Sequence, residues 1–405
     1  PDGCTNCKHK GKITNPLALG RVIKQAPSVP DIPDYPAPYF RGANGGIYVR
    51  VRDADGEEEH RQIYHNDLYV VRRLRDVEIG EAIVMRLHLP KDGVREFTVP
   101  LTAVTSKEEL RKQLSMQGIA VARMDELMQY TTTWVNELQS QSEADEAHRQ
   151  FGWSDDECKS FILGNQEIFK DRVDFNPPSS QTVGLFPSFE PKGSLEGWKE
   201  AINFYNRDDL VLHQFVVGTS FGSPLMQFLP IHCAGLHIHS KESGVGKTTA
   251  MEAGVSVWGS PEDLIIHERD TFNTKMNRGE VYHNLPLYMD ELTNTNGKEL
   301  SNLAYQLTGG RQRGRMSANS NTERARGDAW KLLAVTTGNT SIVERISMIK
   351  AMPKAEAQRI LECRVSRIHF DTKEETDAFS SAIQNNYGHA GKVYIQYIMS
   401  NLDAV

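Results

Sequence analysis

The seven residues that decide the fold read Ser243-Gly244-Val245-Gly246-Lys247-Thr248-Thr249. They follow the apolar stretch GLHIHS (residues 235–240) and open a segment of helical composition. Small residues let successive backbone N–H groups surround a phosphate, and the N-terminus of the following helix adds favourable positive potential. The pattern therefore predicts a phosphate-binding loop, or P-loop, between a strand and a helix of an α/β domain that binds ATP.

Two residues of this loop have specific expected tasks. Lys247 is expected to reach the β- and γ-phosphates, and the Thr248 hydroxyl is expected to bind Mg²⁺. The strict pattern has a glycine where this chain has Lys241, but the Gly-Lys-Thr end carries most of the chemistry. The alternative interpretation is a chance glycine-rich turn, and a second motif at a suitable distance argues against it.

That second motif is LPLYMDE (residues 285–291), an apolar strand that ends in two carboxylates about forty residues after the loop. We expect Asp290 to bind Mg²⁺ through its hydration shell and Glu291 to polarise the water that attacks the γ-phosphorus. The next strand, WKLLAVTTGN, ends in Asn339, whose side chain can orient the same water or contact the γ-phosphate. The alternative for Asn339 is a plain Gly-Asn turn.

Composition limits the class of protein. The chain has 405 residues, 39% hydrophobic and 24% charged, which predicts a globular protein of two or three domains. Its net charge of -7 and pI near 6.0 exclude a surface that coats nucleic acid uniformly, so any DNA contact must be local. No run of about eighteen apolar residues occurs, which predicts no membrane partner, and the few scattered cysteines fit a cytoplasmic location.

The N-terminal residues carry one ambiguous motif, the C-x-x-C of Cys4 and Cys7. It could be half of a zinc site from a longer module, or two free thiols on a solvated tail, and we expect no zinc here. The chain begins with Pro1 rather than Met, which suggests either a fragment of a longer protein that lacks an upstream domain or a trimmed chain.

The pattern along the chain predicts five regions. Short alternating strands and then helices follow the proline-rich start, and from about residue 231 strands alternate with helices, including DLIIHE (263–268) as a strand. The predicted regions are a linker or tail (1–39), an N-terminal α+β domain (40–150), a connecting region with a helical pair (151–230), the ATPase domain (231–370) and a C-terminal helical lid (371–405).

A concentrated positive patch lies in TGGRQRGRMSANSNTERARGDA (308–329), which we call the arginine segment. Its glycines and asparagines predict a flexible hairpin, and alternate arginines would share one face of a strand. In an acidic protein, such a segment can bind phosphates without reading sequence. The alternative is a solvated loop whose charge serves no ligand. The residues expected to contact DNA are Arg311, Arg313 and Arg315.

Taken in order, these motifs resemble AAA+ helicases related to superfamily 3, and more narrowly the phage and mobile-element family known as domain of unknown function 927. The resemblance rests on SGVGKTT, LPLYMDEL, WKLLAVTTGN, QRILECRV and YGHAGKVYIQYI, with a weaker match at FGW (151–153). It implies an AAA+ core, a ring taken as a hexamer with ATP between subunits, and single-stranded or forked DNA in the pore. It further implies a bacterial host cell and a primase or polymerase partner.

The resemblance also implies a cation that acts on the nucleotide of the neighbouring subunit. Arginine suits this task because it is always charged and bidentate. Arg359, in AEAQRILEC, matches the family position, and Arg345, Arg364 and Arg367 are the rival residues.

The sequence thus favours an ATP-dependent DNA helicase of the replicative type. Two alternatives stay open: an ATPase of the same class that remodels proteins or assembles virions, and a catalytically silent loader subunit that only binds nucleotide. The intact Lys247, Asp290 and Glu291 argue against the silent subunit, and the arginine segment favours nucleic acid over protein.

Overall fold

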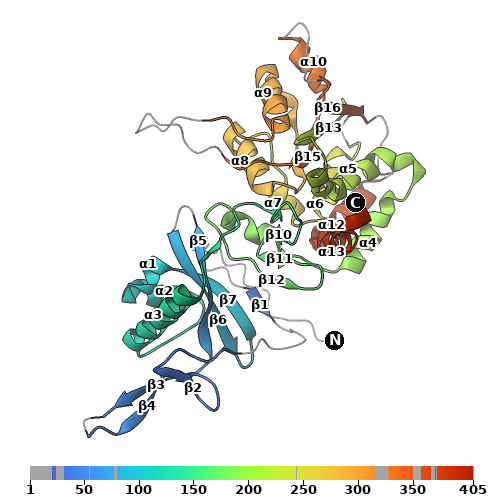
Figure 1. Cartoon of the computed structure of the whole chain (residues 1–405). Coiled ribbons are helices and arrows are strands. Elements are labelled where there is room, and N and C mark those ends of the chain that lie inside the picture. Colours follow the sequence, from blue (N-terminus) through green and yellow to red (C-terminus); the bar gives the residue numbers. More distant parts are fainter. Residues whose placement is uncertain are drawn as a thin grey trace. The chain divides into compact units, whose positions relative to one another are not determined.

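The computed structural model describes residues 21–23, 32–53, 55–76, 80–242, 244–314, 327–349, 357–365, 370 and 372–404. The chain divides into two compact units, residues 1–148 with 177–184, and residues 149–176 with 185–405 (Figure 1). Several residues of the motifs quoted above therefore lie outside the described part, namely Cys4, Cys7, Ser243, Arg315, Arg324, Arg326 and Arg367.

In its described residues, the first unit has one mainly antiparallel sheet, one fully antiparallel sheet and three helices. The larger sheet has the order β1-β7-β6-β5-β8, in which only the β5–β8 pair is parallel, and the smaller sheet has the order β2-β3-β4. The strands are β1 (Arg21–Ile23), β2 (Tyr39–Arg41), β3 (Ile47–Arg52), β4 (Glu58–Tyr64), β5 (Leu68–Asp76), β6 (Gly80–Leu89), β7 (Gly93–Pro100) and β8 (Asp145–Glu146), and the helices are α1 (Leu101–Val104), α2 (Lys107–Met116) and α3 (Met124–Gln141).

The core of this unit lies between the sheets and the helices, which Figure 1 shows beside β5, β6 and β7. Leu110 and Leu114 on α2, and Leu127 and Tyr130 on α3, are buried because they recur at helical spacing. The unit extends beyond the predicted 40–150, because β1 pairs with β7 and residues 177–184 group with it.

The second unit begins with a small antiparallel sheet and a series of helices. The sheet order is β12-β11-β10-β9. These strands are β9 (Gly152–Trp153), β10 (Phe161–Leu163), β11 (Gln166–Ile168) and β12 (Val173–Phe175), and the helical elements that follow are η2 (Val183–Phe189), α4 (Leu195–Ile202), η3 (Asn203–Tyr205), η4 (Asp208–Leu210), α5 (Val211–Gly222) and η5 (Ser223–Phe228).

A four-stranded sheet with the order β14-β15-β13-β16 forms the centre of the second unit, and every neighbouring pair is parallel. Its elements, with the intervening and following helices, are β13 (Cys233–His239), α6 (Lys247–Val255), α7 (Pro261–Leu264), α8 (Phe272–Tyr282), β14 (Leu287–Met289), η6 (Leu292–Asn294), α9 (Gly297–Thr308), β15 (Leu332–Gly338), α10 (Ile342–Ser347), β16 (Ile360–Arg364), α12 (Lys373–Asn385), α13 (Ala390–Ser400) and η7 (Leu402–Ala404).

Helices cover both faces of this sheet. A Cβ atom on Gly222 of α5 would touch Leu333 of β15, whereas Ala334 faces a cavity beside α9. Because successive strand residues point to opposite faces, α5 and α9 lie on opposite sides. Burial on both faces explains the continuous apolar runs of β14 and β15. The predicted mixed α/β architecture is confirmed.

One element of the second unit differs from expectation. DLIIHE does not form a strand: α7 ends at Leu264, and only Ile266 makes a single bridge with Met289. The C-terminal residues form α12 and α13, as helical composition predicts. Phe379 and Ile383 of α12 pack with Tyr205 and Ala253 in one apolar cluster, so α12 is part of the core beside α6.

Candidate active site

The P-loop has the backbone geometry that close approach of a phosphate requires. Gly244 and Gly246 have φ of 74° and 82°, a left-handed conformation that favours glycine, and Gly246 is the N-cap of α6. A Cβ atom on Gly244 would meet nothing within 4 Å, so the loop faces open space there. Lys247 Nζ donates to the carbonyls of Ser240 and Glu242, each at 3.4 Å, and thus stays inside the curve of the loop.

A buried histidine that no sequence motif marks forms a hydrogen bond with the P-loop backbone. His213 of α5 donates from Nε2 to the Val245 carbonyl at 3.2 Å, and both residues are buried. Burial lowers the pKa of His213, which keeps the ring neutral. Thr249, the last residue of the motif, is buried in α6, so Thr248 is the hydroxyl that faces outward.

The acidic strand meets the P-loop through Asp290. Thr248 Oγ1 donates to Asp290 Oδ2 at 3.1 Å, and Thr337 Oγ1 donates to Asp290 Oδ1. The strand register explains the contact between Asp290 and Thr337. Met289 of β14 pairs with Thr336 of β15, so the next residues, Asp290 and Thr337, are neighbours. The carboxyl ends of adjacent parallel strands meet at one edge of the sheet, where ligands of such folds bind.

Glu291 lies in a strained conformation beside Asp290. Its φ of 55° is unusual for a residue other than glycine, and such strain is often found where function requires it. Two contacts hold it: its backbone N–H donates to Thr337 Oγ1 at 2.9 Å, and Asn339 Nδ2 donates to Glu291 Oε1 at 3.3 Å. The Asn339 backbone N–H in turn donates to Thr293 Oγ1 at 2.8 Å.

These residues fit ATP with Mg²⁺. A hydroxyl and a carboxylate, Thr248 and Asp290, are hard oxygen ligands, and Mg²⁺ usually takes one or two such groups together with water and substrate phosphates. Within the described ranges, no group of three or more His, Cys, Asp or Glu residues could hold a metal ion. The donor set suits a hydrated Mg²⁺ that also binds the phosphates of a substrate.

Thr337 is the residue at the centre of this arrangement, and it should behave as a positioning residue. Replacing Thr337 with Val keeps the shape but removes the contacts to Asp290 and to the Glu291 backbone. We expect kcat for ATP hydrolysis to fall about 10- to 100-fold, as for other residues that orient metal-binding or catalytic groups. Thr337→Ser should retain most activity. Equal kcat in Val and wild-type proteins of matching thermal stability would contradict this role.

Arg359 is not brought to this site within one chain. Gly235 pairs with Ile360 and His239 with Arg364, so Arg359 lies at the amino end of the sheet, opposite the P-loop. Its Nε donates to Thr308 Oγ1 at 3.0 Å, and its guanidinium lies 4.6 Å from the centre of the Tyr305 ring.

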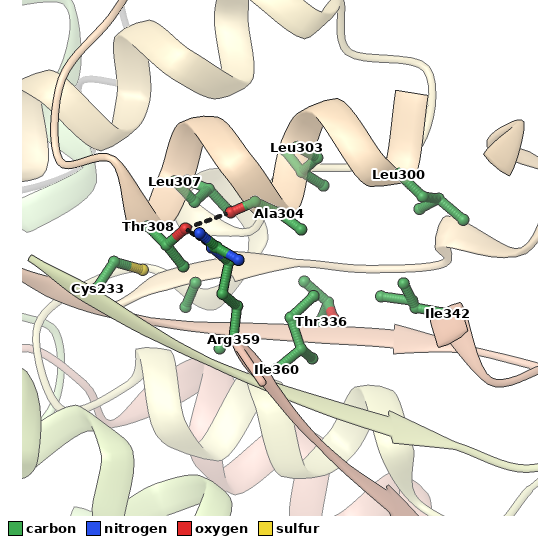
Figure 2. A pocket seen from close by; sticks show the side chains of 12 residues that line it. Cys233, Leu300, Leu303, Ala304, Leu307, Thr308, Thr336, Ile342, Arg359 and Ile360 are labelled. Atoms are coloured by element: carbon green, nitrogen blue, oxygen red, sulfur yellow. Dashed lines mark hydrogen bonds between the residues drawn. The ribbon is translucent and has the colours of Figure 1, made fainter. Parts of the chain in front are cut away.

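Figure 2 shows the Arg359 side chain directed at Thr308 of α9, beside a cavity of about 20 Å³. Leu300, Leu303, Leu307 and Ile360 line the same cavity. Of the rival arginines, Arg364 is exposed at the carboxyl end of β16, and Arg345 lies on α10. Any action of Arg359 on a nucleotide would therefore need a second subunit.

Two of the three arginines expected to contact DNA are described. Arg311 and Arg313 are exposed, and neither forms an ion pair with another residue in the described ranges.

Across the same ranges, no helix is long and apolar enough to cross a membrane.

Comparison with known proteins identifies the family. A family model described as "Domain of unknown function (DUF927)" matches residues 40–327. The chain belongs to the DUF927 family. The match includes the P-loop and the acidic strand, and it ends before three of the segments on which the sequence resemblance rested, namely WKLLAVTTGN, QRILECRV and YGHAGKVYIQYI. No curated protein matches this DUF927 chain.

A solved structure supports the fold of this DUF927 protein. The structure titled "SCCmec type IV Cch - active helicase" matches it with a TM-score of 0.60 and 18% identity, over 91% of this chain and 66% of that one. This chain thus spans slightly less than two thirds of that protein. "The A form apo structure of NrS-1 C terminal region-CTR" matches with a TM-score of 0.35 and 10% identity, over 81% of this chain and 68% of that one. Only the first likeness bears on the fold.

Proposed function

We propose that this DUF927 protein is an ATP-driven helicase that moves along single-stranded DNA. One observation carries the proposal: the hydrogen-bonded series Thr248, Asp290, Thr337, Glu291 and Asn339 at the carboxyl ends of three adjacent parallel strands. It combines a phosphate loop, a hydroxyl and carboxylate for Mg²⁺, and an oriented second carboxylate. Those are the parts that phosphoryl transfer to water requires.

The mechanism assigns each residue a separate task. Lys247 and the loop N–H groups would bind the phosphates, and Thr248 and Asp290 would hold Mg²⁺, which would supply positive charge to the phosphate oxygens. Glu291 accepts a hydrogen bond from the attacking water and takes its proton, and Asn339 fixes the direction of that carboxylate. Asp290 accepts from two threonine hydroxyls, so its carboxylate is oriented before nucleotide arrives.

The proposed track is a polynucleotide, because Arg311 and Arg313 offer exposed guanidinium groups to phosphates in a chain that is acidic as a whole. The likeness to a structure titled as an active helicase supports a polynucleotide as the track. We place the protein in the bacterial cytoplasm as a ring, taken as a hexamer built on an AAA+ core, with single-stranded or forked DNA in the pore and a primase or polymerase as a possible partner.

The decisive experiment measures ATP hydrolysis with and without single-stranded DNA of several unrelated sequences. Strong stimulation by every sequence, together with displacement of a strand from a forked duplex, is the expected result. Hydrolysis that ignores DNA would favour the alternative of a protein-remodelling or virion-assembly ATPase. Absence of hydrolysis with retained ATP binding would favour the silent loader subunit.

Arg359 offers a test of the ring. If its guanidinium stabilises charge on the neighbour's γ-phosphate, Arg359→Ala should lose hydrolysis. Mixing it with Lys247→Ala subunits, which keep Arg359, should then restore about a quarter of the interfaces in a random ring. Loss of hydrolysis with a lower melting temperature and no recovery on mixing would instead assign Arg359 to holding α9 against β16.

A further inference from the structure

A buried carboxylate lies beneath the arginine segment. Glu280 on α8 is only 6% exposed. Its Oε2 accepts from Gln312 Nε2 at 2.6 Å, and its Oε1 accepts from the backbone N–H of Asp328 at 2.9 Å. Gln312 belongs to the outgoing end of the arginine segment and Asp328 to the returning end. One side chain therefore binds both ends.

The surrounding packing fixes these ends in place. A Cβ atom on Gly327 would collide with the Glu280 carboxylate, so a larger residue there would displace that carboxylate. The backbone N–H of Trp330 donates to the Gly310 carbonyl at 2.9 Å, and its indole donates to the Leu307 carbonyl at 2.8 Å. Burying a carboxylate is costly unless hydrogen bonds compensate, and the two ends of the segment supply two of them.

Gln312 differs from its neighbours in exposure. Gln312 is partly buried and bound to Glu280, whereas its neighbours Arg311 and Arg313 are both exposed. The contact with Glu280 thus holds Gln312 inward, between two arginines that face solvent.

The helix that carries Glu280 begins beside the active-site strand. Ile266, just before α8, accepts the backbone hydrogen bond of Asp290 at 2.8 Å. Lys275 of α8 is buried, and its Nζ donates to the Glu268 carbonyl at 3.3 Å. From Lys275 to Glu280 the helix rises by about 7 to 8 Å. The segment that leads into α8 therefore contacts the Asp290 backbone, and α8 itself carries Glu280 to the base of the arginine segment.

We propose that Glu280 is a positioning residue for polynucleotide binding, which holds Arg311 and Arg313 toward the phosphates of a single strand and makes hydrolysis respond to that strand. The inference rests on the proposed function and adds to it a residue that no sequence motif marks. Glu280 itself touches neither nucleotide nor DNA.

The direction of the change in DNA affinity distinguishes this positioning role from a simple electrostatic effect of the Glu280 charge. Removing a negative charge close to a phosphate-binding surface should strengthen DNA binding through the field alone. The positioning role gives the opposite result, because Gln312 and the Asp328 N–H lose their partner and the arginines lose their direction. We expect Glu280→Ala to raise the Kd for an oligo-dT strand about tenfold, since phosphate contacts dominate such binding.

The experiment compares four variants of the full chain. Glu280→Ala should lose DNA stimulation of hydrolysis while its DNA-free rate stays near wild type. Gln312→Glu should be impaired as well, because it brings two carboxylates together. The double variant Glu280→Gln/Gln312→Glu should recover, because it restores one carboxylate, one carboxamide and the wild-type net charge. Glu200→Ala removes an exposed carboxylate of α4 and serves as the matched control.

Each outcome decides the proposal. Recovery in the double variant, with no effect of Glu200→Ala, supports it. Wild-type or stronger oligo-dT binding by a folded Glu280→Ala protein would overturn it, as would a double variant that remains as impaired as Gln312→Glu. Failure of the proposed function is a separate result, because then wild-type protein itself would show no DNA-stimulated hydrolysis.

Discussion

Replacing Glu291 with Gln should abolish ATP hydrolysis while leaving ATP binding in place. The carboxamide keeps the size and can still meet Asn339, but it cannot take a proton from water. General-base catalysis contributes about 10²- to 10⁴-fold, so single-turnover hydrolysis should fall by that factor. The Kd of a fluorescent ATP analogue should change little, because the P-loop and Lys247 are untouched.

Lys247→Ala is the matched contrast to that variant. It removes the cation that we propose binds phosphate, so it should weaken nucleotide binding as well as hydrolysis. The two variants together separate binding from chemistry. Wild-type turnover in a well-folded Glu291→Gln protein would remove Glu291 from the catalytic role and leave Asp290 as the remaining carboxylate at this edge.

Local patterns were enough to predict the strands and the helix around the candidate site, namely β13, α6, β14 and β15. The P-loop, the acidic strand and the strand before Asn339 are recognisable because each combines an apolar run with polar residues at its end. The same logic failed for DLIIHE, where Pro261 starts a helix and only Ile266 pairs with the sheet. A short apolar run does not by itself distinguish strand from helix.

Contacts between distant residues could not be predicted in this way. Thr337 resembles any buried strand threonine until the register of β14 and β15 brings it to Asp290 and Glu291. His213 lies on an apolar helix 32 residues before Val245, and no spacing rule connects the two. Such residues could be suspected only as polar groups in otherwise apolar segments, which must find a partner when buried.

Glu280 is the clearest example of a contact that local sequence patterns cannot predict. It is an ordinary helix residue by composition, yet it meets Gln312 and Asp328, which are 32 and 48 positions later in the chain. The arginine segment itself was recognisable from charge alone. What the sequence did not contain was the means by which its two ends are held together, because that depends on how α8 packs beside Trp330.

The second large effect concerns DNA binding by Arg311 and Arg313. If both guanidinium groups contact phosphates, replacing both with Ala removes up to two ion contacts for each subunit that engages the strand. The slope of log affinity against log salt should then become shallower by up to about 1.4 per engaged subunit, at about 0.7 for each contact with a single strand. The loss should be similar for unrelated sequences, because phosphates carry no sequence information.

The rate of ATP hydrolysis without DNA distinguishes loss of DNA binding from damage to the fold. Without DNA, the double variant should hydrolyse ATP at the wild-type rate, because neither arginine contacts Lys247, Asp290 or Glu291. Unwinding of a forked duplex should be lost, since the protein would then hydrolyse ATP without binding the strand. An unchanged slope and affinity would place DNA on another surface, of which the sheets of the first unit are the next candidate. That outcome would also restore the protein-remodelling alternative, because the arginine segment is the main feature that favours nucleic acid over protein.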